Sequence, residues 1–99
     1  MTFDQIKRAT AKRMGVTVEQ LEMHNRKKRF VHPRHLAMMI ARDETGASYD
    51  SIGAAFGGRD HSTVSHACTN MGYLCAFPPP GQDFAADRDA IIYAAKTMD

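Results

Sequence analysis

The stretch "AFGGRDHSTVSHA", residues 55–67, places two glycines, an arginine and an aspartate before polar side chains that are small or carry an imidazole. Adjacent glycines break a helix, and an aspartate just ahead of a periodic segment is a preferred N-cap. We therefore expect a turn at Gly57-Gly58 and a helix that begins after Asp60. Four kinds of site use such a layout: a phosphate-binding loop, a metal site, a catalytic dyad or a helix that contacts DNA bases.

The segments on both sides of this turn have helical periodicity. Ahead of it, Ser48 is expected to cap a short helix that buries Ile52 and Phe56. After it, apolar residues recur at helical spacing as far as about Cys75, and the opposite face carries a polar stripe. The stripe consists of Ser62, Ser65, His66 and Thr69, with His61 and Thr63 near the start of the helix. A short helix, a glycine turn and a longer helix with a polar outer face predict a helix-turn-helix.

The rest of the chain predicts more helices and no strands. Thr2 and Thr17 each precede a glutamine by three residues, which is the capping-box pattern of a helix start. The segment MHNRKKRFVH, residues 23–32, has no periodicity and is expected to be a basic loop. Pro33 suits the first turn of a third helix that ends at Gly46.

The C-terminal quarter of the chain has a different composition. Residues 76–84, AFPPPGQDF, are typical of a stiff linker, and residues 83–98 predict a final helix with one apolar face. We therefore divide the chain into a helix-turn-helix domain, residues 1–76, and a linker with a C-terminal helix, residues 77–99. This helix either folds back over the core of the domain or contacts a protein of replication or transcription.

Charge is distributed unevenly along the 99 residues. Residues 1–35 contain nine basic and three acidic side chains, a net charge of +6, although the whole chain carries only +2. A basic surface on a small domain favours a polyanion as partner, and nucleic acid is the leading candidate; a solvated basic face without a partner is the alternative. No apolar run is long enough to cross a membrane, so we expect a cytoplasmic protein at the nucleoid.

The other three kinds of site fit the residues less well. His61 and His66 are five residues apart and do not share a helix face, whereas helical zinc ligands are three or four apart. Ser62 and Ser65 lack the glycine-flanked turn of a nucleophilic serine, and Gly57-Gly58-Arg59 is too short for a nucleotide-binding loop. We therefore expect no metal, no cofactor and no enzymatic activity.

Longer motifs make the likeness specific. The segments PRHLAM at residue 33 and FGGRDHSTV at residue 56, followed by HAC at residue 66, resemble the C-terminal DNA-binding domain of the bacterial replication initiator DnaA. The resemblance extends over about residues 3–75. It implies an all-α helical bundle with a DnaA/Trp-repressor-like helix-turn-helix and binding to a short A·T-rich duplex site, the DnaA box. It also implies that the helix after Asp60 enters the major groove, while an arginine of the basic segment enters the minor groove.

The resemblance assigns a role to each matching position. Arg26 takes the place of the minor-groove arginine, and Arg34 that of a second arginine of the loop. Asp60, His61, Ser62 and Thr63 match the major-groove contacts. Arg42, Ser48, Arg59 and His66 fall where contacts that position the DNA backbone are expected. The remaining expected DNA-binding residues are Lys27, Lys28 and His35.

Five positions depart from the family pattern. Ser62 replaces a threonine and so lacks a methyl group that would contact thymine, and His35 replaces a glutamine. Tyr49-Asp50 replaces a leucine–proline-like pair, and Asn70 replaces a basic residue.

Three roles are open for a domain of this kind. We expect a stand-alone domain without the ATPase of the initiator, which occupies DnaA boxes and regulates replication or transcription, for example by competition with the initiator. One alternative is nonspecific, nucleoid-associated DNA binding through the basic segment. The other is a protein-interaction adaptor that uses the C-terminal helix.

Overall fold

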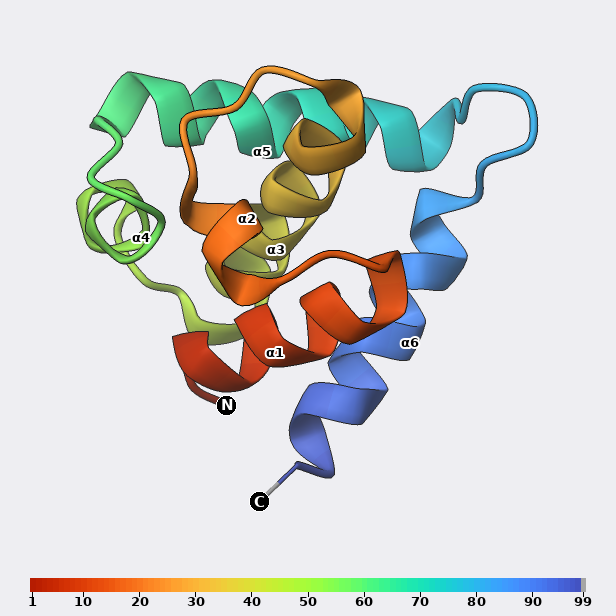
Figure 1. Ribbon diagram of the computed structural model, residues 1–99, viewed down its shortest axis with the longest axis horizontal. Coiled ribbons are helices and arrows are strands. Elements are labelled where there is room, and N and C mark those ends of the chain that lie inside the picture. Colours follow the sequence, from red (N-terminus) through yellow and green to blue (C-terminus); the bar gives the residue numbers. More distant parts are fainter. Residues whose placement is uncertain (99) are drawn as a thin grey trace.

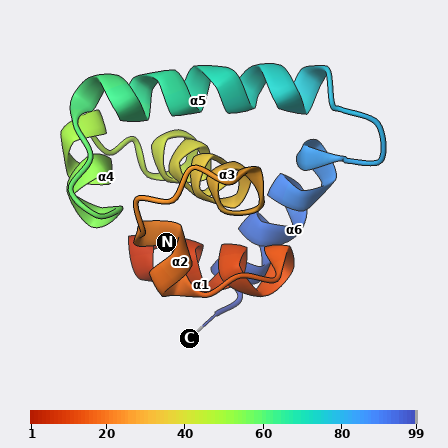
Figure 2. The same ribbon diagram turned by 45° about the horizontal axis from the view of Figure 1, so that its top comes forward.

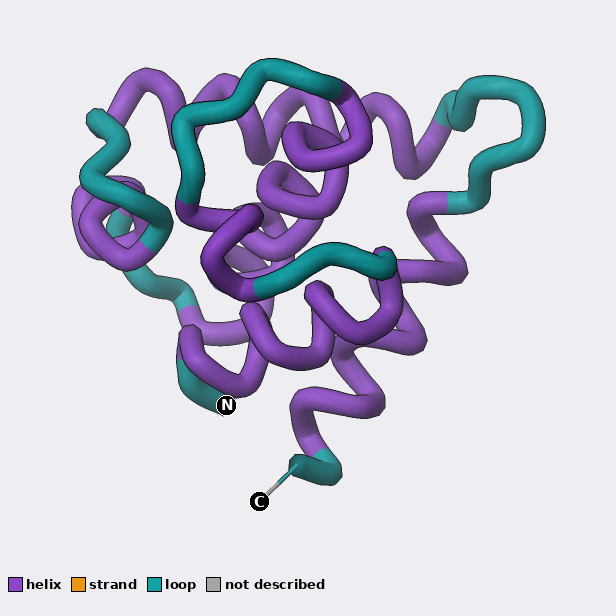
Figure 3. The backbone as a smooth tube through the Cα atoms, in the orientation of Figure 1, coloured by secondary structure: helices purple, strands orange, loops and turns teal. Residues whose placement is uncertain are grey.

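The computed structural model describes residues 1–98 and consists of helices joined by loops (Figures 1 and 3). The six helices within residues 1–98 are α1 (Phe3–Met14), α2 (Val18–Glu22), α3 (Lys28–Thr45), α4 (Tyr49–Ala55), α5 (His61–Ala76) and α6 (Phe84–Lys96). No strand occurs within residues 1–98, which confirms the expected all-α fold. None of the helices described is both long and apolar enough to span a lipid bilayer.

The helix starts and stops follow the local signals of the sequence. Thr2 and Thr17 both form complete capping boxes, in which the threonine hydroxyl accepts a hydrogen bond from the backbone N–H three residues later and the glutamine side chain accepts one in return. Gly15 ends α1 and Gly46 ends α3, both in the left-handed conformation that glycine adopts without strain. Asp83 caps α6.

The start of α3 differs from the expectation. The helix begins at Lys28, five residues before Pro33, so that Pro33 lies inside it and only residues 23–27 form the basic loop. Proline disfavours a helix interior because it lacks an N–H and crowds the preceding turn. Here the additional turn buries Phe30, and Phe30 and Val31 both donate backbone hydrogen bonds to the Lys27 carbonyl. Tertiary packing therefore outweighs the local preference of Pro33 for the first turn.

The helix α3 is the centre of the bundle and contacts all five other helices (Figure 2). Its apolar side chains are buried over nearly its whole circumference. The core around it consists of Ile6, Ala9, Leu36, Ala37, Met38, Met39, Ile40, Ala41, Ile52, Phe56, Val64, Ala67, Met71, Phe84, Ile91 and Ala95. Because all other helices pack on α3, the basic loop and the start of α5, which lie near the first turns of α3, are held in a fixed arrangement.

The helices α4 and α5 form the expected helix-turn-helix, and Gly53 makes the turn compact. Gly57 and Gly58 have φ of 83° and 75°, and the Gly53 carbonyl accepts backbone hydrogen bonds from Gly58 and Arg59. A Cβ on Gly53 would lie only 2.0 Å from the Arg59 carbonyl oxygen. The backbones of α4 and the turn therefore approach so closely that only glycine fits at position 53.

The C-terminal helix α6 folds back on the rest of the chain. It packs mainly against α1 and also contacts α3 and α5 (Figure 1). Phe84, Ile91 and Ala95 are buried and belong to the same core cluster as the residues of α3 and α5. Of the two expected roles for this helix, covering the chain's own core is the one that the structure shows.

Candidate nucleic-acid interface

The start of α5 presents four polar side chains to solvent: Asp60, His61, Ser62 and Thr63, which we call the recognition tip. One carboxylate oxygen of Asp60 accepts a hydrogen bond from the Thr63 backbone N–H at 2.8 Å. This bond is the main cause of the lowered pKa of Asp60, so its carboxylate is ionised when it caps the helix. The cap uses Oδ1, which leaves Oδ2 able to accept a hydrogen bond from a ligand.

The basic loop lies beside the recognition tip (Figure 1). Arg26 and Lys27 in the loop, and Lys28 at the start of α3, are exposed. A pocket of about 320 Å³ lies between the loop and the start of α5. Its lining residues are His24, Asn25, Arg26, Val31, Arg34, His35, Arg59 and Thr63. Five of the residues expected to bind DNA, from three separate segments, thus meet at one pocket.

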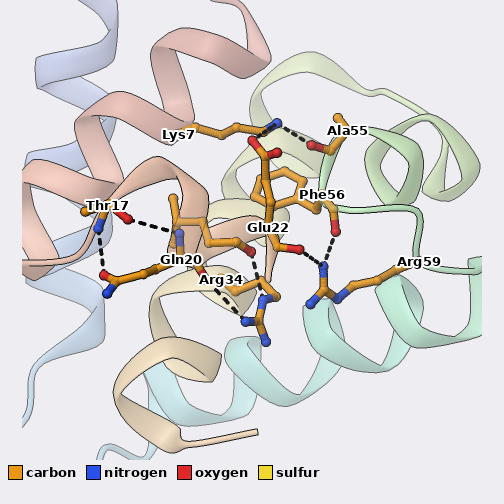
Figure 4. Close-up of polar contacts among 9 residues, drawn as sticks. Lys7, Thr17, Gln20, Glu22, Arg34, Ala55, Phe56 and Arg59 are labelled. Atoms are coloured by element: carbon orange, nitrogen blue, oxygen red, sulfur yellow. Dashed lines mark hydrogen bonds and ion pairs between the residues drawn. The ribbon is translucent and has the colours of Figure 1, made fainter. Parts of the chain in front are cut away.

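Arg34 is not a loop residue, because it lies in the second turn of α3 and is only 4% exposed. Its guanidinium donates hydrogen bonds to the backbone carbonyls of Leu21 (2.8 Å), Met23 (2.6 Å) and Asn25 (3.0 Å). A weaker bond, to the Gln20 carbonyl at 3.4 Å, is drawn in Figure 4. Burial, and then the positive charge of Arg59, lower its pKa to about 10. The expectation that Arg34 lies in the loop is therefore wrong. Arg34 belongs to α3, and its hydrogen bonds hold the end of α2 and the basic loop against α3.

Arg59 also binds the backbone at the end of α2 and the start of the basic loop. It donates hydrogen bonds to the carbonyl of Glu22 (3.2 Å) and to that of Phe56 in its own turn (Figure 4), and also to that of Met23 (2.5 Å). Partial burial lowers its pKa. The side chain expected to contact the DNA backbone is therefore engaged by the protein backbone in the free molecule.

His35 faces the pocket with a neutral ring. Burial, followed by the charges of Arg34, His32 and Arg59 in that order, lowers its pKa to about 4. Its Nδ1 is buried and has no hydrogen-bond partner within residues 1–98. A neutral imidazole beside two arginines avoids a third positive charge at this point.

A second group of expected residues lies at the start of α4. Ser48 caps this helix by accepting a hydrogen bond from the Ser51 N–H at 3.1 Å. Arg42 donates to the Ala47 carbonyl at 2.8 Å, and its guanidinium lies 4.3 Å from the centre of the Tyr49 ring. His66 is exposed on α5, five residues after His61. These side chains extend the surface that starts at the recognition tip.

Sequence reasoning missed three contacts at this surface. His24 Nε2 lies 2.9 Å from the Gly57 carbonyl oxygen, Asn25 lines the pocket, and Tyr49 packs against His61. A histidine and an asparagine in a polar segment carry no periodic signal, so only the tertiary arrangement identifies them. The replacement of a leucine–proline-like pair by Tyr49-Asp50 was the one available signal for Tyr49.

Comparison with known proteins agrees with this geometry. Residues 3–71 match the model of a family described as the bacterial DnaA protein helix-turn-helix. The chain belongs to this DnaA family. It is 41% identical over 71 residues to the chromosomal replication initiator protein DnaA of Symbiobacterium thermophilum, which covers 72% of the chain and 16% of that protein. It is 43% identical over 71 residues to DnaA of Acinetobacter baumannii, covering 72% of the chain and 15% of the relative.

The match confirms the resemblance to DnaA and identifies the type of domain. The chain spans about one sixth of the length of the DnaA proteins that it matches. The matched region contains the helix-turn-helix and the basic loop, whereas α6 lies beyond it. The domain is therefore a DnaA-type helix-turn-helix, a domain that binds DNA.

Proposed function

We propose that this protein recognises a specific sequence in double-stranded DNA at A·T-rich, DnaA-box-like sites. The proposal is supported by one observation: the recognition tip and the basic loop line opposite sides of the same pocket. A duplex presents its major and minor grooves on either side of a phosphate backbone. In the proposed complex α5 enters the major groove, Arg26 enters the adjacent minor groove, and the backbone between them passes the pocket.

The recognition tip has the chemistry for contacts with base edges. Ser62, Thr63 and the neutral form of His61 can donate and accept hydrogen bonds, and the Thr63 methyl group fits against a thymine methyl. Oδ2 of Asp60 can accept a hydrogen bond from a cytosine amino group while Oδ1 caps the helix. Ser62 has no methyl group, so we expect weaker selection for thymine at its base pair.

The minor-groove contact is assigned to Arg26. Its side chain is exposed at the middle of the basic loop. A·T-rich DNA has a narrow minor groove with a strongly negative potential, which favours an inserted arginine. Lys27, Lys28, Ser48 and His66 are exposed around these two elements and are proposed to contact phosphates, which position the protein without selecting sequence.

Occupation of DnaA-box-like sites has a regulatory consequence. A domain that binds the same sites as a replication initiator excludes it from them, or places a second protein beside it. We propose that the protein acts in this way on replication or on transcription. A gel-shift competition tests this directly, because the purified protein should displace an initiator DnaA from box DNA at concentrations near its own Kd. If the initiator stays bound when the protein occupies free box DNA, the competitor role is wrong.

Selection of bound sites from a random duplex library tests the specific recognition. Moderate salt is required because phosphate contacts otherwise dominate the affinity. We expect one short A·T-rich motif, with selection lost at particular base pairs in Thr63→Ala and His61→Ala. A library without enrichment, together with affinity that falls steeply with salt for all sequences, would instead show nonspecific binding through the basic loop.

A further inference from the structure

The end of α2 is in direct contact with the turn of the helix-turn-helix. A Cβ on Gly57 would lie 2.2 Å from the Glu22 carbonyl oxygen, so the two backbones touch. His24 Nε2 is 2.9 Å from the Gly57 carbonyl oxygen, and Lys7 Nζ binds both the Glu22 carboxylate at 3.0 Å and the Ala55 carbonyl. The basic loop starts at this junction, because Met23 follows Glu22 directly.

Two arginines from different elements meet at the first residue of the basic loop. Arg34 of α3 and Arg59 of the turn both donate a hydrogen bond to the Met23 carbonyl, at 2.6 and 2.5 Å. Arg34 also binds the carbonyl of Asn25, which adjoins Arg26. The residue directly after Arg59 is Asp60, the N-cap of α5. The hydrogen bonds of Arg34 and Arg59 therefore connect Arg26, proposed for the minor groove, to α5, proposed for the major groove.

We propose that Arg34 and Arg59 are positioning residues that fix the distance between Arg26 and the recognition tip. They would thereby determine which spacing of minor-groove and major-groove contacts the protein accepts on duplex DNA. This inference rests on the proposed function, because it concerns the accuracy with which the two grooves are contacted together.

The chemistry of arginine suits this role better than direct contact with phosphate. Arg34 uses Nε, Nη1 and Nη2 for carbonyls, and Arg59 uses both Nη atoms. The planar guanidinium holds several acceptors in a fixed arrangement, which the single ammonium of lysine does not. The carbonyls at the end of a helix carry partial negative charge, which compensates for the closeness of the two cations.

The decisive variant is Arg59→Lys, which keeps the charge but loses the fixed geometry. Its affinity is compared on the selected site and on the same site with one base pair inserted between the minor-groove and major-groove parts. For the wild type we expect the insertion to weaken binding by about tenfold, because one of the two contacts is lost. For Arg59→Lys we expect weaker binding to the selected site and an insertion penalty of about threefold or less.

Three companion variants interpret this result. Arg26→Ala removes the proposed minor-groove contact and should abolish the insertion penalty. Arg29→Lys makes the same chemical change on an arginine that lies over the Phe30 ring, 4.6 Å from its centre, and should behave as the wild type. Arg34→Lys should resemble Arg59→Lys; because Arg34 is buried, its thermal unfolding is recorded, and the more exposed Arg59 decides the test if Arg34→Lys fails to fold.

A double-mutant cycle separates positioning from direct contact. If Arg59 acts through the basic loop, Arg59→Lys has little further effect on affinity in the Arg26→Ala background. Additive effects of the two substitutions, or an insertion penalty in Arg59→Lys equal to that of the wild type, would overturn the inference and leave the proposed function intact. A wild-type protein without any sequence preference would overturn the proposed function itself, and the inference with it.

Discussion

The imidazole ring of His61 packs edge-on against the phenol ring of Tyr49, with the ring centroids 5.1 Å apart and the planes at 90°. The Tyr49 ring is itself held under the guanidinium of Arg42, and the Asp50 carboxylate lies 3.8 Å from His61 Nδ1. The start of α4 thus orients the first side chain of α5.

Tyr49→Leu is predicted to reduce affinity for the selected site while leaving nonspecific binding unchanged. An aromatic pair of this geometry contributes about 0.5–1.5 kcal/mol, so we expect a loss of about threefold to tenfold. Fluorescence anisotropy with the selected duplex and with a scrambled duplex measures both quantities. Tyr73→Leu replaces an exposed aromatic residue near the end of α5 and should change neither the specific nor the nonspecific affinity. An equal loss of affinity on both duplexes would mean that Tyr49 stabilises the fold and does not specifically orient His61.

Gly53→Ala is predicted to destabilise the protein severely. The added Cβ would meet the Arg59 carbonyl oxygen at 2.0 Å, its carbon at 2.9 Å and a Val64 methyl group at 3.3 Å. Two of these atoms are backbone, so the turn must open before the methyl group fits. We expect a decrease of about 3 kcal/mol or more in the free energy of unfolding, measured by urea denaturation.

Gly72→Ala is the matched control for this prediction. Gly72 is exposed within α5, and a Cβ there meets no atom within 4 Å. Alanine has the higher helix propensity, so we expect stabilisation by about 0.5–1 kcal/mol. If the two substitutions had similar effects, the close approach between α4 and the turn would be wrong.

Local signals were sufficient to predict the helices and the turn, because caps and glycine stops act over a few residues. Thr2, Thr17, Ser48 and Asp60 all form the cap bonds that their sequence positions indicate. The predicted start of α3 at Pro33 was wrong, because the stabilisation gained by burying Phe30 depends on the position of α3 at the centre of the bundle. No window of sequence contains that information.

Five of the expected DNA-binding residues lie around one pocket, but the contacts that two of them make could not be predicted from the sequence. The resemblance to DnaA implied that Arg34 and Arg59 contact DNA. In the structure their guanidinium groups bind carbonyls of residues 20–25, which lie 9–37 positions away in the chain, and Arg59 also binds the Phe56 carbonyl of its own turn. Backbone carbonyls are the same in every sequence, so nothing in the residue pattern marks them as the acceptors.

Ile91→Ala is predicted to destabilise the whole domain, although Ile91 lies outside the region that matches DnaA. Its side chain is fully buried in the core cluster shared with α3 and α5. Removal of such a side chain costs about 2–5 kcal/mol. Tyr93→Ala removes a larger side chain that is 72% exposed and should change the stability by less than about 0.5 kcal/mol. Thermal unfolding of both variants shows whether α6 unfolds together with the rest; a separate transition for α6 would contradict this prediction.

Stability is predicted to fall between about pH 6.5 and pH 4 because of His35. Burial lowers the pKa of its imidazole to about 4 in the folded protein, whereas an unfolded histidine has a pKa near 6.5. The unfolded state therefore binds a proton first as the pH falls, so the stabilisation is complete above pH 6.5 and lost as the pH approaches 4. His35 is partly exposed, and we expect a loss of about 2 kcal/mol after allowance for solvent screening.

Glutamine at position 35 isolates this contribution from those of the other titrating groups. His35→Gln keeps a polar side chain of similar size and cannot take up a proton, so its free energy of unfolding should decrease by about 2 kcal/mol less than that of the wild type between pH 7 and pH 4.5. His66→Gln, at an exposed position on α5, should retain the wild-type pH dependence. Urea denaturation at the two pH values gives all three differences. If His35→Gln and the wild type lose equal stability, the pKa of His35 is the same in the folded and the unfolded protein, and this prediction is wrong.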